Sequence, residues 1–481
     1  MTSVAGFDES FFSDSACKWR RGLENGDYSP RELLGAVWER ILERNPRINA
    51  LAAYDFDSAL RQADEAEKLF ARNEARPLEG LPITVKDSFE TAGLLTTCGA
   101  QALAEYVPRQ DAEAVARLRA AGAIVLAKSN VPRLTADFQT FNALFGVTCN
   151  PWDDRLTPGG SSGGAAAAVA SGFGAFDLAS DLGGSIRWPA HACGVFGLKP
   201  SWRRVSLAGH IPPLPPLRLK NPPDLAVAGP LARSAADLDL VLSLVEDRGH
   251  PAPAPRRASP ADLRLALWLD PDFAPVDPDV EAGVRLAARI FRDAGASVAE
   301  AGPAIAFAEA FAIYVTLNFA IGFAGAPQEK ARFAAEAEKF ERDDFSYPAL
   351  RARAAKLDAA TFSLLAERRK AIGAAFAAFF ERFDAILCPP APCLAFPHDC
   401  SPDPFSRRLP VGAGALSYHD LLKWAGLASL ALLPAAVAPV ALTPRGLPTG
   451  VQIISARGED RMAVALAGMI EQATGGFRAP K

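Results

Sequence analysis

The chain is poor in lysine, cysteine and net charge, and each shortage excludes a class of protein. Its 51 basic and 55 acidic residues leave a formal net charge of −4, with no long run of either sign. This balance excludes the electrostatic footprint that binding to nucleic acid or to an anionic membrane requires. Seven cysteines, an odd number, are typical of reduced thiols and not of a disulfide framework. Only 12 of the basic residues are lysines, so a lysine in an apolar setting stands out.

Signals for export, membrane insertion and metal binding are also missing. The first 21 residues contain no basic segment followed by an apolar one, so we expect no secretory signal and a cytoplasmic location. The charge-free stretch 424–443 is long enough to cross a bilayer, but Pro434 and Pro439 interrupt it. A buried helix end followed by a core strand is therefore predicted there. The cysteines between 388 and 400 match no zinc spacing, so no metal site is expected.

What the sequence does have is enough apolar residues, 49%, to bury a large core. A capping box at 29–32 precedes apolar residues at helical spacing, namely Leu33, Val37, Ile41 and Leu42. Further helices are expected at 58–72 and 111–121, and short buried strands at 81–85 and 123–127. This alternation predicts an α/β fold with helices layered around one sheet, beginning with an N-terminal helical segment over residues 1–75.

The second half continues the alternation after two proline-rich passages, an irregular loop at 210–223 and a linker at 250–260. Its expected strands are 263–269, 297–301, 385–387 and 436–442, and its expected helices are 280–294, 366–383 and 460–474. These strands are too few to build another core. We therefore expect them to complete the first sheet, which makes residues 1–481 a single domain.

Three local features are candidates for chemistry: Lys86 at the end of the apolar run 81–85, and two Gly/Ser loops at 158–164 and 181–187. Tandem glycines let backbone N–H groups approach an anion or a developing oxyanion. Neither loop has the lysine of a phosphate-binding P-loop, so nucleotide binding is not predicted.

The run 160–164 formally matches the Gly-x-Ser-x-Gly nucleophile elbow of α/β-hydrolases. That elbow requires a strand before the serine, whereas residues 150–158 carry two prolines and three charges. Its triad would also need Asp384 or Asp399 with His419, and nothing local supports that. The elbow interpretation is therefore disfavoured.

Together these segments and their flanks resemble the amidase signature family. The residues that carry the resemblance lie at 127–130, 145–152, 158–164, 183–190, 193–200, 229–233 and 446–452. The match is most specific over the catalytic core block 81–206 and poorest at 304–345, which is expected to be a variable substrate-pocket segment. The resemblance implies a single large domain with a mixed central β-sheet covered by helices on both faces, and neither a metal nor a cofactor.

The resemblance also implies a catalytic triad in which Ser185 is the nucleophile, Ser161 a bridging serine preceded by a cis peptide, and Lys86 the base. The chemistry is consistent, because an alcohol is a weak nucleophile near neutral pH and needs a base within reach. A lysine can be that base only when it is neutral, which burial favours. Asp87, the next residue, should point to the opposite face of the strand, so its carboxylate need not hold Lys86 in the charged form. Lys86 is therefore the lysine whose setting fits a neutral base.

Further roles follow from the same resemblance. The oxyanion hole would be formed by the backbone N–H groups of Leu182, Gly183, Gly184 and Ser185. Around it, Asp181 and Arg187 would be a structural pair, and Ser162 a supporting hydroxyl. An apolar or aromatic substrate pocket is expected from Thr135, Phe138, Phe141, Leu144 and Trp188, with Leu182 standing where many members have threonine. The family uses no histidine, so structural or pocket-lining roles are expected for His191, His210 and His419.

These features predict an amidase that hydrolyses the C–N bond of a hydrophobic or aryl carboxamide through a seryl acyl-enzyme, with ester or carbamate side activity. Its expected partner is the small-molecule amide, with no nucleic acid or membrane, and the chain is expected to be a monomer or homodimer. One alternative is the glutaminase subunit of a tRNA-dependent amidotransferase, which the apolar Phe138 and Phe141 disfavour. Another is an inactive binding protein, which the intact triad positions disfavour.

Overall fold

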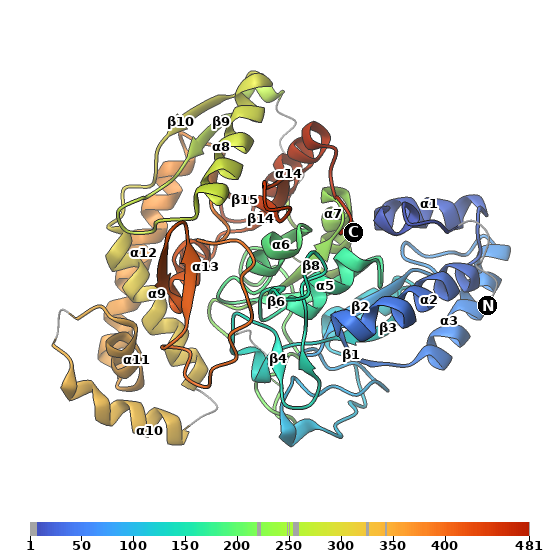
Figure 1. The fold of residues 1–481 in the computed structure, drawn as a ribbon, viewed down its shortest axis with the longest axis horizontal. Coiled ribbons are helices and arrows are strands. Elements are labelled where there is room, and N and C mark those ends of the chain that lie inside the picture. Colours follow the sequence, from blue (N-terminus) through green and yellow to red (C-terminus); the bar gives the residue numbers. More distant parts are fainter. Residues whose placement is uncertain are drawn as a thin grey trace.

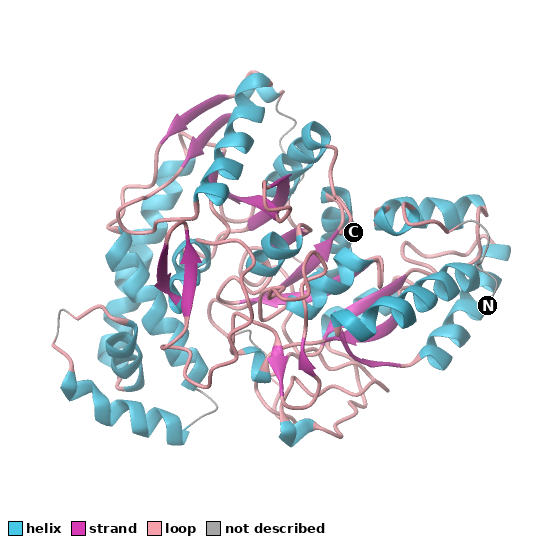
Figure 2. Ribbon diagram, viewed as in Figure 1, coloured by secondary structure: helices cyan, strands magenta, loops and turns pink. Residues whose placement is uncertain are grey.

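A computed structural model of the protein describes residues 7–480, apart from 219–222, 248, 250, 254–258, 324–326 and 342–343. Parts of the predicted proline-rich loop, of the predicted linker and of the 304–345 segment therefore lie outside the described residues. The fold consists of a large central sheet with helices packed on both of its faces (Figures 1 and 2).

Across the described residues, the central sheet has 11 strands. They are β1 (Leu51–Tyr54), β2 (Pro82–Lys86), β3 (Ile124–Ser129), β6 (Phe176–Asp181), β7 (Phe196–Lys199), β8 (Val227–Ala232), β9 (Arg264–Leu267), β10 (Ser297–Glu300), β11 (Ala385–Cys388), β14 (Ala435–Leu442) and β15 (Pro448–Ser455). Their order is β1-β3-β2-β6-β8-β7-β14-β15-β11-β9-β10. The sheet is mixed, because β2 runs parallel to β3 and β6, whereas β14 runs antiparallel to β7 and β15. Both halves of the chain share it, as predicted.

The helices are α1 (Ala16–Asn25), α2 (Pro30–Ile48), α3 (Phe56–Ala71), α4 (Glu113–Ala120), α5 (Gly163–Ser171), α6 (Arg187–Cys193), α7 (Ala235–Val245), α8 (Pro278–Asp293), α9 (Phe307–Gly322), α10 (Pro327–Glu336), α11 (Tyr347–Ala355), α12 (Ala359–Phe380), α13 (Leu422–Leu430) and α14 (Asp460–Thr474). Two hairpins lie outside the sheet: β4 (Phe141–Asn142) with β5 (Gly146–Val147), and β12 (Arg408–Val411) with β13 (Gly414–Ser417). The helices and strands named in advance from periodicity are all present, within a few residues of their predicted ends except at the start of α12.

The period of two along the strands divides the core between the two faces of the sheet. On β2, Ile83 and Val85 join the cluster that packs against α2, α4, α7 and α14. On the opposite face, α5 and α6 pack over β6 and β14, and α9 and α13 pack near β9 and β11. Lys86 alternates with Val85 and therefore belongs to the second face. The site described below lies on this face.

Two expectations about the helices can be compared directly with the structure. The predicted capping box is present, because the Ser29 hydroxyl accepts from the Glu32 N–H and the Glu32 carboxylate accepts from the Ser29 N–H. Of the apolar residues at helical spacing, Ile41 is buried, whereas Leu42 is 56% exposed. One residue is 100° around a helix, so Leu42 turns out of the apolar stripe that Ile41 joins.

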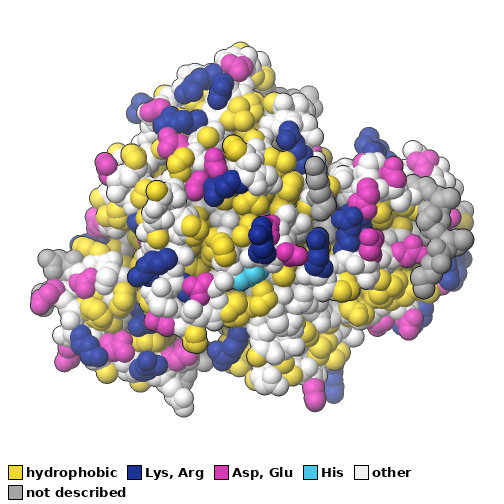
Figure 3. Space-filling view, in the orientation of Figure 1, with side chains coloured by type: hydrophobic (Ala, Val, Ile, Leu, Met, Phe, Trp, Pro, Cys, Tyr) yellow, Lys and Arg dark blue, Asp and Glu magenta, His cyan; other side chains and the backbone are white. Residues whose placement is uncertain are grey.

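The charge-free stretch forms α13 and then β14, as predicted. Among the described residues, no helix has both the length and the apolar character needed to cross a bilayer. The face of the molecule in Figure 3 shows basic and acidic side chains interspersed with apolar ones.

Candidate active site

Lys86 ends β2 with its side chain fully buried. Its Nζ lies 2.8 Å from Ser161 Oγ, 3.0 Å from Ser180 Oγ and 3.2 Å from the Ser180 carbonyl oxygen. Burial lowers the pKa of Lys86 to about 7, against the weaker opposing effects of nearby acidic groups. The amine can therefore be neutral near physiological pH.

Ser161 lies in the loop before α5, and the peptide bond between Gly160 and Ser161 is cis. Gly160 packs directly on the neighbouring backbone, since a Cβ there would lie 2.6 Å from the carbonyl carbon of Phe138. Only glycine fits so close an approach. The loop thus presses against residues 138–139 while it presents the Ser161 hydroxyl to Lys86.

Ser185 follows β6 and is half-buried, whereas Lys86 and Ser161 are buried. The Ser162 N–H donates to the Ser185 carbonyl oxygen at 3.3 Å, and the Ser162 hydroxyl donates to the Ser180 carbonyl oxygen at 3.3 Å. These two bonds hold the Gly/Ser loops side by side. The structure thus brings all three predicted triad residues into one place.

Asp181 and Arg187 form the predicted buried pair, with 2.8 Å between Arg187 Nη2 and Asp181 Oδ1. Burial alone would raise the pKa of Asp181, but the guanidinium charge and hydrogen bonds hold it well below its usual range. Arg187 also donates to Gln452 Oε1 and to the Ala425 carbonyl oxygen, both at 2.7 Å. The pair therefore ties the loop at 181–187 to α13 and β15.

The loop departs from the expected oxyanion hole at Gly184. The Gly184 N–H donates to Asp181 Oδ1 at 2.9 Å, so this group is engaged and does not face a substrate. Within the described part of the chain, the N–H groups of Leu182, Gly183 and Ser185 have no acceptor. Gly184 has φ +96, a left-handed conformation that glycine adopts readily. The backbone turn at Gly184 is thus the place where the loop binds the buried Asp181 carboxylate.

Two residues complete the surroundings of Lys86: Ser180, which the sequence did not suggest, and His210, for which a structural or pocket-lining role was expected. Nε2 of His210 lies 2.9 Å from Ser180 Oγ. Burial and the nearby Lys86 lower the pKa of His210 to about 3, so the imidazole is neutral.

A neutral Lys86 has two N–H groups and one lone pair for its three contacts in this cluster. The tautomer of His210 sets whether Nε2 donates to Ser180 Oγ or accepts from it. Where the Ser180 hydroxyl oxygen accepts one N–H of Lys86 and the Ser180 carbonyl oxygen accepts the other, the lone pair of the neutral amine is left for the Ser161 hydroxyl. Ser180 directly precedes Asp181 in sequence, which is the one signal that could have suggested it.

Burial does not distinguish Lys86, contrary to the prediction from sequence. Lys128 and Lys199 are also fully buried, and burial lowers their pKa values to about 8 and about 7. Lys128 lies 3.9 Å from Asp87 and Lys199 donates to the Leu433 carbonyl oxygen at 2.6 Å. Lys86 differs from them in its contact with Ser161. As expected, Asp87 faces Lys128 and not Lys86.

A family model described as Amidase matches residues 32–464. The chain belongs to the amidase family. One subunit of the glutamyl-tRNA(Gln) amidotransferase of Roseiflexus castenholzii is 39% identical over 292 residues, which cover 58% of each chain. The match thus spans less than two thirds of that relative. An indoleacetamide hydrolase from Bradyrhizobium diazoefficiens is 32% identical over 96% of this chain and 86% of its own. A crystal structure of an amidase superposes with TM-score 0.79 at 28% identity, covering 96% of this chain and 100% of the other.

In this amidase family chain, the predicted pocket residues fall into two groups. Trp188 Nε1 donates to the Phe138 carbonyl oxygen at 2.9 Å, and the Phe138 ring lies 5.3 Å from the ring of Tyr418. Phe138 also packs with Leu182 against the cluster formed by α9 and α13. The other predicted residues lie elsewhere in the 133–147 segment: Thr135 in a 3-10 turn, Phe141 on β4 below the Arg407 guanidinium, and Leu144 in the β4–β5 turn.

The remaining histidines have other surroundings. His191 Nδ1 accepts from the Gly450 N–H at 3.1 Å, and the His419 ring stacks on Phe405 with 4.4 Å between centroids. Among the described residues, no group of three His, Cys, Asp or Glu side chains is arranged to hold a metal ion.

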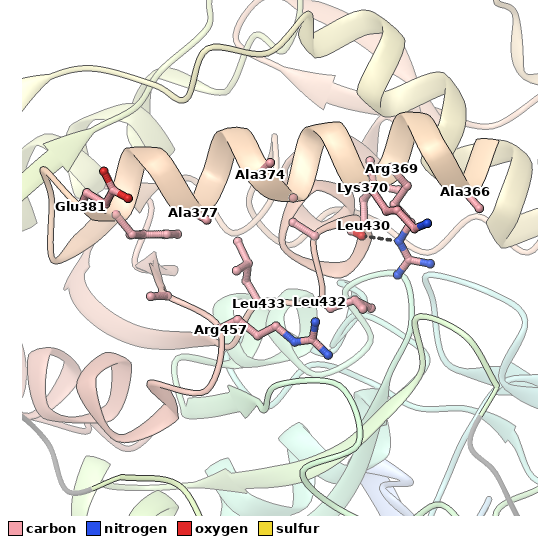
Figure 4. A pocket seen from close by; sticks show the side chains of 14 residues that line it. Ala366, Arg369, Lys370, Ala374, Ala377, Glu381, Leu430, Leu432, Leu433 and Arg457 are labelled. Carbon is pink, nitrogen blue, oxygen red and sulfur yellow. Dashed lines mark hydrogen bonds between the residues drawn. The ribbon is translucent and has the colours of Figure 1, made fainter. Parts of the chain in front are cut away.

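A separate cavity of about 760 Å³ lies between α12 and residues 430–433 (Figure 4). Its walls are largely apolar; Arg369 comes from α12, as does Ala374, and Arg457 lies across the cavity from that helix. Arg369 is engaged there, donating to the Leu430 carbonyl oxygen at 2.7 Å. None of the candidate site residues lines this cavity.

Proposed function

We propose that this member of the amidase family hydrolyses the C–N bond of a carboxamide through an acyl-enzyme on Ser185. The observation that carries the proposal is the buried contact of 2.8 Å between Lys86 and Ser161, next to the loop that bears Ser185. A neutral Lys86 can accept a proton, and a hydroxyl can donate and accept at once. Ser161 can therefore pass the proton of Ser185 to Lys86.

The reaction follows from these roles. Ser185 Oγ attacks the amide carbonyl carbon, its proton moves through Ser161 to Lys86, and the carbonyl oxygen becomes an oxyanion held by backbone N–H groups. The C–N bond then breaks, and the proton on Lys86 returns through Ser161 to the leaving amine. Water attacks the resulting acyl ester, which releases the carboxylic acid and restores Ser185.

The substrate class that we propose is a hydrophobic or aryl carboxamide, with ester or carbamate cleavage as side activity. Phe138 and Leu182 support it, because both are apolar and pack beside the oxyanion loop. The name of the relative indoleacetamide hydrolase also supports it, since that name describes an amide of an aryl acid. We expect the enzyme to work in the cytoplasm as a monomer or homodimer.

A second candidate function is that of a glutaminase subunit in a tRNA-dependent amidotransferase. The names of several relatives favour it. It would require a site for the polar glutamine side chain and partner subunits. Release of ammonia from glutamine by the purified chain, faster than from aryl amides of similar size, would favour this candidate.

The test is a panel of amides, esters and carbamates of graded acyl size, assayed with the native chain and with Ser185→Ala. We expect the variant to be folded and inactive on an aryl amide, and a fluorophosphonate to label the native chain only. Ser363→Ala, an exposed serine on α12, serves as the matched control and should keep full activity. Full activity of Ser185→Ala would refute the proposal, and absence of both turnover and labelling would favour an inactive binding protein.

A further inference from the structure

Tyr314 connects α9 to the loop that precedes Ser185. The side chain is fully buried, and its hydroxyl lies 3.1 Å from the Leu182 carbonyl oxygen. One turn later on α9, Asn318 donates its Nδ2 to the same tyrosine oxygen at 3.2 Å. Because Asn318 is the donor in that bond, the hydroxyl proton is left for the Leu182 carbonyl. Helix α9 thus holds one carbonyl of the loop.

The orientation of that carbonyl decides where the next N–H points. The Leu182 C=O and the Gly183 N–H belong to one planar trans peptide, in which the two groups point in opposite directions. The peptide between Gly184 and Ser185 is fixed in the same way, because the Gly184 carbonyl oxygen accepts from the Trp188 N–H at 2.7 Å. Its other group, the Ser185 N–H, points away from α6.

Asp181 fixes the orientation of the peptide between Gly183 and Gly184, which lies between these two peptides. It binds the Gly184 N–H at 2.9 Å, and so that group is turned away from the Gly183 and Ser185 N–H groups. Three contacts from three different directions therefore set three successive peptide planes. The N–H groups of Gly183 and Ser185, on either side of the engaged Gly184 N–H, have no acceptor among the described residues.

Packing keeps the tyrosine ring in place between α13 and the loop. Gly426 on α13 has no side chain, and a Cβ there would lie 2.4 Å from the Tyr314 ring. A Cβ on Gly183 would lie 3.4 Å from the Tyr314 hydroxyl oxygen and 2.9 Å from Leu422. The ring thus has little room to move.

We propose that Tyr314 is a positioning residue for the oxyanion hole. By holding the Leu182 carbonyl, it aims the Gly183 N–H at the substrate carbonyl oxygen, next to the Ser185 N–H. The inference rests on the proposed function, because it needs an oxyanion to form at Ser185. It also gives a role to the 304–345 segment, where the resemblance to the family is poorest.

The experiment compares Tyr314→Phe with Tyr28→Phe, both measured on the aryl amide that the native enzyme cleaves. Tyr28 is the matched control, because its hydroxyl donates to the Trp19 carbonyl oxygen at 2.9 Å in the N-terminal helical segment. We expect Tyr314→Phe to lower kcat about 10- to 100-fold with KM within about twofold, since loss of a whole oxyanion donor costs about 10²–10³. Tyr28→Phe should keep the native kcat.

A second measurement separates positioning from general damage. An aryl trifluoromethyl ketone forms a C–O bond with Ser185 Oγ, while the serine proton moves to Lys86 and the carbonyl electron pair stays on oxygen as an oxyanion. Its inhibition constant should rise in Tyr314→Phe by the same factor as kcat falls, whereas inhibition by the carboxylate product should not change. Unchanged kcat, or equal weakening of both inhibitors, would overturn the inference. Failure of the proposed function would appear separately, as activity that survives in Ser185→Ala.

Discussion

At the scale of single residues, the contacts of a lysine, and not its burial, indicate whether it can act as the catalytic base. Lys86, Lys128 and Lys199 are all buried and all have lowered pKa values. Lys199 donates to backbone carbonyls, and Lys128 to a carbonyl and to the Thr91 and Thr96 hydroxyls. Lys86 instead touches the hydroxyl of Ser161, which adjoins the loop that bears Ser185. The contact that singles out Lys86 therefore exists only in the folded chain, because Ser161 lies 75 positions further along.

Replacement of Lys86 should affect amides more than activated esters. An amine is a poor leaving group and needs a proton, whereas a nitrophenolate does not. We expect Lys86→Ala to lower amide turnover by about 10²–10⁴ and turnover of a nitrophenyl ester of the same acid by clearly less. Steady-state kinetics on both substrates checks this, with Lys199→Met as a control for loss of a buried lysine. Equal losses on the two substrates would contradict the role of Lys86 as proton donor and acceptor.

The pH dependence of kcat/KM should follow Lys86. Burial lowers its pKa to about 7, and only the neutral amine can accept the serine proton. The rate should therefore fall about tenfold per pH unit below that pKa and reach a plateau above it. A pH–rate profile between pH 5 and 9, recorded where the fold is intact, tests this expectation. A rate that stays flat or declines across that range would speak against a neutral lysine base.

At the scale of secondary-structure elements, α9 and α13 are joined by the contact between Tyr314 and Gly426. We expect Gly426→Ala to destabilise the fold by up to about 2 kcal/mol, because an overpacked core costs about 1–3 kcal/mol and the gain in helix propensity is about 1 kcal/mol. Gly373 on α12 is the matched control, since a Cβ there would meet nothing within 4 Å. Gly373→Ala should stabilise by up to about 1 kcal/mol.

Denaturant titration of both glycine variants provides the measurement. Gly426→Ala should also lose amide turnover, because displacement of the Tyr314 ring releases the Leu182 carbonyl. If the two variants changed the free energy of unfolding alike, the close packing of Tyr314 against α13 would be refuted.

Elements with a clear pattern were predictable, and elements buried on every side were not. The amphipathic helix α8 and the strands β2 and β3 follow from periodicity, within a few residues. Helix α5 is Gly163–Ser171, a run of small residues buried on all sides, so no polar face marks it as helical. The glycines that suggested only a loop in fact begin this helix.

At the scale of the whole molecule, β14 joins the two halves of the chain. It pairs with β7 from the first half and with β15, which in turn pairs with β11. We therefore expect one cooperative unfolding transition, reported alike by far-UV circular dichroism and by tryptophan fluorescence. Trp19 and Trp268, one in each half, are both buried and serve as local probes when each is left as the only tryptophan. Two separate transitions would show that the halves fold as independent domains.

The sequence by itself determined the family resemblance and the layered α/β fold, because these depend on local motifs and periodicity. Through that resemblance it also predicted Lys86, Ser161 and Ser185 as the triad. Only the tertiary structure decided which lysine meets a serine and which N–H groups remain free at the oxyanion loop. It also showed that Ser180, His210 and Tyr314 surround the site. The physical reason is that hydrogen-bond direction and burial arise from contacts between segments far apart in sequence, which no local pattern encodes.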